Sequence, residues 1–299
     1  MKIPRHLIPL PLLKILRVIK RKLILFYESF LFMLNKWFEP RHVNLGGGVF
    51  VALGWRNLEA VASHVNPHPF QFTPDCTVPF SDNSVETVYS SHALEHLDQP
   101  TVDRLLQEAY RILKPEGRLI LKLPDFDRTL DCWKKSDNSF FEDDWGFGGA
   151  IETWPDRNIP DTVDSRAAFV FCGFWNDDYG NHFEQAWAGN LLSEQGEAPV
   201  SAYHGPPSIS KDVLQELKTS HSPKHIAQTL RKMVVEKEPS YYFNHQSAWG
   251  RQELKELVTE LGFSVVSQET KFVLRECGDI PKITEMLSIS MYLLARKEN

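Results

Sequence analysis

The chain has few cysteines, no excess of basic residues and no long uncharged hydrophobic run. Its four cysteines lie far apart and form no CxxC pair, which excludes a disulfide scaffold and a zinc ribbon and is typical of a reducing, cytoplasmic environment. The formal net charge of −6 argues against a general nucleic-acid-binding protein. With 299 residues, 42% of them apolar, the sequence instead predicts a globular protein with one large or two modest domains.

The positive charge is concentrated at the N-terminus. Residues 1–41 carry nine basic and two acidic groups, while the rest of the chain is acidic. The apolar stretch Leu10–Phe38 contains no uncharged run longer than Ser29–Asn35, well short of the roughly 20 residues of a membrane span. A signal peptide fits poorly, because the basic cluster lies inside the apolar region. Residues 1–41 therefore predict a basic amphipathic helical extension, which either lies on the inner membrane surface through residues 1–38 or packs against protein.

Two short strands, each followed by a characteristic side chain, begin the next region. Val43–Leu45 runs into Gly46, Gly47 and Gly48, and glycines after a strand let the backbone turn tightly and approach a ligand. A second short strand ends before Glu59. A carboxylate in that position can accept hydrogen bonds from both hydroxyls of a ribose.

The pattern continues as strand, turn, helix and strand. A polar loop precedes a predicted strand over Val85–Tyr89, and His92–Leu97 follows at its end. Apolar residues at helical spacing predict a helix over Thr101–Leu113, broken by Pro115-Glu116-Gly117. An apolar strand over Arg118–Leu123 comes next.

The motifs in this order resemble class I S-adenosylmethionine-dependent methyltransferases, in particular the bacterial branch with an HxLEHL motif after the fourth strand. They read LGGG, GWRNLE, PFSDNS, SSHALEHL, EAYRILKPEGRL and PDF, within residues 42–127. The resemblance implies a Rossmann-like, doubly wound, seven-stranded α/β sheet whose last strand is antiparallel. It places a methyltransferase domain at 42–299, with an inserted cap at about 131–245.

The resemblance also implies which residues bind S-adenosylmethionine. Glu59 would bind the ribose hydroxyls, and His92 would lie at the pocket edge. The full set that it implies is Gly46, Gly47, Gly48, Glu59, Asp75, Cys76 and His92, with the three glycines near the methionine part and Asp75 near the adenine. The glycine loop departs from the family pattern, because Asn44 stands in place of an acidic residue and bulky Val49-Phe50-Val51 follows.

The stretch His92–His96 also matches HxxEH, the inverted zinc-protease pattern. On a helix, His92 and His96 would share a face and could bind zinc, with Glu95 as the base. Because the stretch directly follows a predicted strand, we favour a packing role for His96 and a pocket-facing role for His92. We assign no metal ligands here.

Residues 131–204 are rich in aromatic and acidic side chains. They contain five of the eight tryptophans, and fourteen acidic residues against four basic ones. Aromatic faces stack on sugars and hold cations, which favours an acceptor-binding cap over a satellite core that only stabilises the insertion. The negative charge argues against a polyanionic acceptor and favours a neutral or cationic one.

Candidate catalytic residues lie inside this insertion. A hydroxyl acceptor must lose a proton, and His182 or His204 could remove it, with Asp178 or Glu184 orienting the imidazole. Alternatively, Asp177, Asp178 and Glu184 could hold a divalent ion that lowers the hydroxyl pKa. The sequence therefore predicts methyl transfer to an oxygen of a small-molecule or carbohydrate-like acceptor. N- or C-methylation of a metabolite, and a non-catalytic binding module, are the alternatives.

Overall fold

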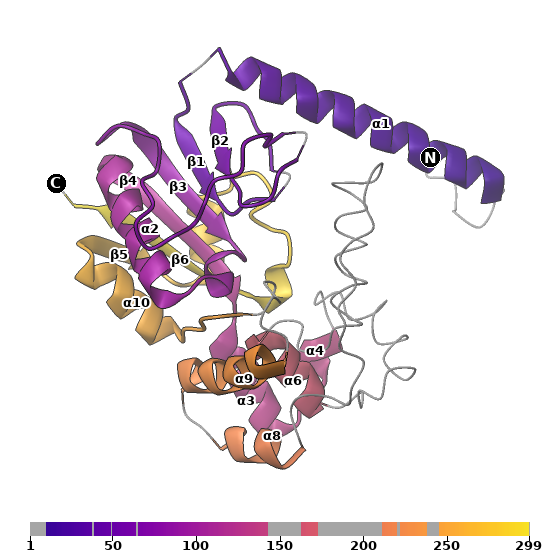
Figure 1. The fold of residues 1–299 in the computed structure, drawn as a ribbon, viewed down its shortest axis with the longest axis vertical. Coiled ribbons are helices and arrows are strands. Elements are labelled where there is room, and N and C mark those ends of the chain that lie inside the picture. Colours follow the sequence, from indigo (N-terminus) through magenta and orange to yellow (C-terminus); the bar gives the residue numbers. More distant parts are fainter. Residues whose placement is uncertain are drawn as a thin grey trace.

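The chain folds around one six-stranded β-sheet in the computed structural model (Figure 1). The sheet has the order β2-β1-β3-β4-β6-β5. Its strands are β1 (His42–Leu45), β2 (Trp55–Leu58), β3 (Val85–Ser91), β4 (Leu113–Pro124), β5 (Phe263–Ser267) and β6 (Ser290–Lys297). The structure describes residues 10–37, 39–48, 50–63, 65–142, 163–172, 211–219, 222–237 and 245–298.

Strands β1 to β4 are parallel, and β6 runs antiparallel to both β4 and β5. The Rossmann-like topology and the antiparallel last strand are therefore confirmed. The described residues form six strands, one fewer than the sequence predicted. The segment between β2 and β3 folds back on itself instead of adding a strand, because Asn66 donates from its amide to the carbonyls of Glu59 and Val61. This leaves β2 at the edge of the sheet.

Helices cover both faces of the sheet. Helices α2 (Gln99–Ile112) and α10 (Arg251–Glu260) pack through Leu105, Leu106 and Leu254 against one face. Helix α11 (Thr270–Glu276) packs through Val273 against the other face, beside Tyr292 of β6. Burying both faces of the central strands supplies the main apolar stabilisation of the domain.

The predicted elements of residues 42–127 are confirmed with shifted ends. Helix α2 starts earlier than expected, because the Asp98 side chain accepts from the Thr101 N–H as an N-cap and Pro100 fits the first turn. Strand β4 starts at Leu113 and runs through Pro115–Gly117, where a break was expected. Glu116 takes a positive φ of 62°, and the β3–β4 register shifts between Val85 and Thr87. Pro115–Gly117 therefore form an irregular first part of β4 and do not separate it from α2.

A second, helical core follows β4. It contains α3 (Phe126–Lys135), α4 (Ser139–Glu142), α6 (Val163–Cys172), α8 (Lys211–Leu217) and α9 (Pro223–Lys237). Trp133 is fully buried in this core, and its indole N–H donates to the Asp164 carboxylate at 2.7 Å. The described part of the insertion thus contains a hydrophobic core of its own. The other tryptophans of the 131–204 region, Trp145, Trp154, Trp175 and Trp187, lie outside the described residues.

Helix α1 (Leu10–Asn35) is attached at its C-terminal end and extends away from the sheet (Figure 1). The Asn35 amide donates to the carbonyls of Ala52 and Trp55 and accepts from the Gly54 N–H. Large apolar side chains further back along α1 are exposed, including Leu23 (63%), Phe26 (73%) and Tyr27 (60%). Within the described chain, no helix combines the length and the apolarity needed to cross a membrane.

Helix α2 holds the loop before β3 through a buried carboxylate. Glu108 is 2% exposed, accepts from the Val78 N–H at 2.8 Å, and pairs with Arg111 at 2.6 Å and Arg104 at 3.2 Å. Burial alone would raise the pKa of Glu108, but the hydrogen bonds from Arg111 and Val78 outweigh burial and lower the pKa. This cluster ties the loop that contains Asp75 and Cys76 to the domain.

We expect Glu108→Gln to lower the free energy of unfolding by about 2 kcal/mol, since it leaves two guanidinium groups without their buried counter-ion. Glu86→Gln, which breaks the exposed pair with Arg41, should cost at most about 1 kcal/mol. Because the pKa of Glu108 is lower in the folded protein than in the unfolded chain, its carboxylate stabilises the fold fully at pH values above the ordinary glutamate pKa. This stabilisation is lost as the pH falls through the pKa that Glu108 has in the folded protein. Chemical denaturation should therefore show the Glu108 effect at pH 7 and a shrinking effect in acid; equal costs for both variants would contradict this assignment.

Candidate cofactor site at the carboxyl ends of the strands

The carboxyl ends of β1, β2 and β3 meet where the strand order reverses. In an open parallel sheet, ligands bind in the crevice at such a switch point. Gly46–Gly48 follow β1, Glu59 follows β2 and His92 follows β3. The structure thus places these predicted cofactor residues at the same edge of the sheet.

The glycine loop packs closely on its neighbours. Gly46 has a φ of +71°, and a Cβ built on it would lie 2.3 Å from the Cβ of Ala93, just after β3. A Cβ on Gly47 would lie 2.0 Å from the Asn44 amide nitrogen and 2.3 Å from the Asn57 amide oxygen. Gly46 therefore has no room for a side chain where it approaches the end of β3, and a side chain at Gly47 would displace the Asn44 and Asn57 amides.

Glu59 fixes the loop from the neighbouring strand. Its side chain is buried, and one carboxylate oxygen accepts from the Gly48 N–H at 2.5 Å. The other oxygen accepts from the Ala60 N–H at 2.8 Å. Each carboxylate oxygen has a second lone pair, so the group remains able to accept hydroxyl donors. Glu59 is thus held in a fixed orientation at the crevice.

Asp75 and Cys76 lie in the loop that precedes β3, and their surroundings differ from each other. Asp75 is exposed in a turn. Cys76 is buried in the main hydrophobic core, and its carbonyl accepts from Arg104 at 2.7 Å. Packing explains the position of Cys76, and a contact of either residue with the adenine stays a prediction.

His92 lies in a strained turn at the end of β3. Its φ is 49°, its N–H donates to the Lys122 carbonyl at 2.9 Å, and its Nε2 is 2.8 Å from the Ser290 hydroxyl. The following short 3₁₀-helix, η2 (Leu94–His96), does not include His92. His92 and His96 therefore do not lie one turn apart on a helix face, as an HxxEH zinc site would need.

The predicted catalytic residues cannot be placed. His182, His204, Asp178 and Glu184 all lie outside the described residues, as does Asp177. Their roles stay predictions.

The structure brings together three potential metal ligands that the sequence analysis did not associate with one another. Glu95 and His96 of η2 lie close to His245, which precedes α10, and their ligand-type atoms are all within 4.8 Å of one another. The sequence carried the HxxEH pattern, but nothing near residue 245 indicated a partner for it.

A separate hollow of about 620 Å³ lies along the edge strand β2 and the end of α1. Asn35, Trp55 and Asn66 line it, while Gly46–Gly48, Glu59 and His92 do not. Its lining is therefore distinct from the predicted cofactor residues at the carboxyl ends of the strands.

Comparison with known proteins finds a methyltransferase domain in this part of the fold. Residues 56–121, which run from β2 to β4, match the family model described as a methyltransferase domain. This part of the chain is a methyltransferase domain. S-adenosylmethionine is accordingly the cofactor that the crevice residues have to fit. The buried carboxylate of Glu59 is a suitable acceptor for the ribose hydroxyls of this cofactor. The glycine loop has no side chains that would keep its methionine part away from the backbone.

Similar proteins are found over part of the chain or at low identity. A stretch of 62 residues is 36% identical to the ubiquinone/menaquinone biosynthesis C-methyltransferases UbiE of Brucella canis and Brucella abortus. It covers 19% of this chain and 22% of each relative, so the chain matches only about a fifth of their length. An S-adenosylmethionine-dependent methyltransferase from Mesorhizobium loti is 11% identical, with 87% of this chain and 91% of that chain covered and a TM-score of 0.37. One from Archaeoglobus fulgidus is 12% identical, with 93% and 94% covered and a TM-score of 0.36.

We expect Glu59→Gln to weaken S-adenosylmethionine binding by about 10- to 100-fold, because it replaces a charged acceptor for the ribose hydroxyls by a neutral amide. Titration calorimetry of the full chain measures the change. Glu260→Gln, at an exposed position on α10, serves as the matched control and should leave the affinity unchanged. Equal affinities in the wild type and Glu59→Gln would show that the carboxylate only holds the glycine loop.

Proposed function

We propose that this protein transfers the methyl group of S-adenosylmethionine to an oxygen of a small-molecule or carbohydrate-like acceptor. The observation that carries the proposal is the Glu59 carboxylate bound to the Gly48 N–H at the switch point of the sheet. It supplies a buried acceptor beside a backbone loop, which is the arrangement that a ribose-containing cofactor needs. The aromatic-rich region 131–204 supports a sugar-like acceptor, and its acidic charge supports a neutral or cationic one.

Methyl transfer depends mainly on positioning. The acceptor oxygen has to approach the methyl carbon in line with the bond to sulfur, and held reactants supply much of the rate. The oxygen gains the methyl group, the bond from carbon to sulfur breaks, and S-adenosylhomocysteine leaves. The hydroxyl proton needs a base, for which His182 or His204, oriented by Asp178 or Glu184, stays our proposal.

We expect the purified full chain to bind S-adenosylmethionine and to release S-adenosylhomocysteine when the correct acceptor is supplied. Calorimetry tests the first part, and a screen of hydroxylated metabolites and sugars, read out by S-adenosylhomocysteine release, tests the second. If no binding is detected at S-adenosylmethionine concentrations up to about 1 mM, the binding free energy is weaker than about 4 kcal/mol. A non-catalytic binding module would then be the better description of the protein.

C-methylation of a metabolite is the second candidate. The match to the UbiE C-methyltransferases favours it, although that match covers only 62 residues. Mass spectrometry and NMR of the methylated product separate the candidates, since an O-methyl and a C-methyl group have different chemical shifts. An N-methylated product would contradict both.

Helix α1 supports a further proposal, that the protein lies peripherally on an anionic membrane surface. Lys20 and Lys22 are exposed on a helix that also exposes large apolar side chains, and this combination suits the interface of an anionic bilayer. The exposed apolar residues of α1 are Val18, Ile19, Leu23, Ile24, Phe26, Tyr27, Phe30 and Met33. Packing of the helix against the main domain agrees less well with this exposure, and packing against a partner subunit is the other candidate.

We expect the full chain to co-sediment with phosphatidylglycerol vesicles and not with phosphatidylcholine vesicles. Reversing both charges, in Lys20→Glu/Lys22→Glu, should weaken binding about tenfold or more, because each basic group near the surface contributes about 1 kcal/mol. The matched control is Lys255→Glu/Lys271→Glu, at exposed positions away from α1. Equal loss in both double variants would point to net charge rather than to α1.

A further inference from the structure

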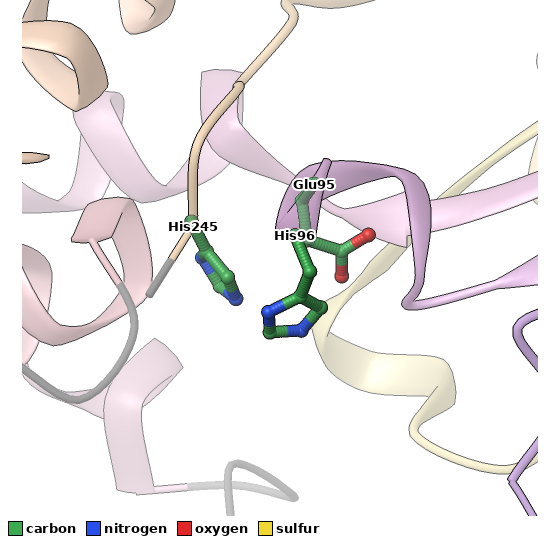
Figure 2. Close-up of side chains that lie close together, drawn as sticks. All are labelled: Glu95, His96 and His245. Atoms are coloured by element: carbon green, nitrogen blue, oxygen red, sulfur yellow. The ribbon is translucent and has the colours of Figure 1, made fainter. Parts of the chain in front are cut away.

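Glu95, His96 and His245 form a compact group at the end of β3. Figure 2 shows the three side chains close together, two from η2 and one from the segment that precedes α10. Their ligand-type atoms lie within 4.8 Å of one another, while ligands around a tetrahedral zinc ion are spaced about 3.3 Å apart. Side-chain rotation would have to close this difference when an ion binds.

Among the described residues, the buried Glu95 carboxylate has one recorded ion-pair partner, the His92 imidazole at 3.4 Å, and no recorded hydrogen bond. It is 0% exposed, and neither oxygen has a hydrogen-bond donor among the described residues. A buried carboxylate without donors is costly, and its cost is normally met by donors or by a cation. The group therefore points to a missing positive charge.

His92 does not supply this charge in its neutral form. Its Nδ1 is 3.4 Å from a Glu95 oxygen, and its Nε2 contacts the Ser290 hydroxyl. Ser290 donates its only proton to the Met286 carbonyl, so Nε2 of His92 has to donate to Ser290. This arrangement leaves Nδ1 of His92 facing the carboxylate as an acceptor.

His245 is oriented as metal-binding histidines usually are. Its Nδ1 is 2.6 Å from the Val170 carbonyl, so Nδ1 carries the proton and Nε2 is left as the ligand atom.

Backbone hydrogen bonds hold the three residues together. The Glu95 carbonyl accepts from the Gln246 N–H at 2.6 Å and from the Ser247 N–H at 3.1 Å. The His245 N–H donates to the Cys172 carbonyl at the end of α6. The group is thus built where β3, α6 and the segment before α10 meet, and not on a single mobile loop.

We propose that Glu95, His96 and His245 bind a divalent transition-metal ion, with Zn²⁺ as the ion that fits best. Two imidazoles and one carboxylate are the protein ligands of open zinc sites, in which the fourth position is left for water or substrate. Mg²⁺ fits poorly, because it prefers oxygen ligands and octahedral geometry. The ion would lie next to the proposed cofactor crevice, because Ala93, which directly precedes η2, lies against Gly46 of the glycine loop.

The role of this ion rests on the proposed function. An acceptor hydroxyl in the open position would have a lowered pKa and lose its proton to solvent. Its oxygen would form the bond to the methyl carbon as the bond from that carbon to sulfur breaks. The ion would thus hold the acceptor beside the cofactor and remove the need for a strong base.

The test is a calorimetric titration of ZnCl₂ into the chelator-treated full chain. We expect one Zn²⁺ per chain, and Glu95→Gln and His245→Gln should each weaken binding by at least about tenfold. His68→Gln and Glu260→Gln, both at exposed positions, are the matched controls and should bind like the wild type. Co²⁺ should give the strong visible absorption of a four-coordinate site, lost on addition of Zn²⁺.

Absence of binding, or equal affinities in all variants, would overturn the site. Displacement of Zn²⁺ by millimolar Mg²⁺ would overturn the choice of ion. If the variants do not fold, the Co²⁺ spectrum of the wild type still decides, since weak six-coordinate absorption contradicts the site. Titration with S-adenosylmethionine is independent of these results: failure there with Zn²⁺ bound would overturn the proposed function and leave the metal site standing.

Discussion

The close approach of the glycine loop to the end of β3 is the contact on which the cofactor crevice depends. Gly46 lies so near Ala93 that no side chain fits between them, and Gly47 is equally close to the amides of Asn44 and Asn57. Through Gly48, the same loop is bound to Glu59 at the end of β2. The glycine loop therefore connects the ends of β1, β2 and β3. This connection fixes the position of the Glu59 carboxylate and of the turn at Ala93 that leads into η2.

Local patterns predicted the parts of this crevice that local physics decides. A glycine run after a strand and a carboxylate after the next strand were recognisable because turn geometry and strand ends leave signatures within a few residues. The same reasoning found α2, where Asp98 caps the helix and an apolar stripe faces the sheet. It failed for the seventh strand, since the ring contact between Phe70 and Phe72 and the side-chain bonds of Asn66 hold that segment as a loop against the core.

His245 could not be found from the sequence, for a physical reason. Its position follows from backbone bonds between Glu95 and residues 246–247, and from the Val170 and Cys172 carbonyls at the end of α6. These contacts join parts of the chain that the helical insertion separates, and no periodicity or spacing records them. The rejection of an HxxEH zinc motif rested on its local geometry. It did not consider that Glu95 and His96 could share a ligand set with a distant residue.

The helical core of residues 126–237 acquires a second role from this arrangement. It buries Trp133 and Phe171, and α6 of the same core ends at the carbonyls that orient His245. The packing of this helical core therefore sets the position of a side chain next to η2. A carboxylate as deeply buried as Glu95 is stable only when this packing also supplies a counter-charge. If the counter-charge is an ion with an open coordination position, the base that a hydroxyl acceptor needs does not have to come from His182 or His204, since the ion itself lowers the pKa of the hydroxyl.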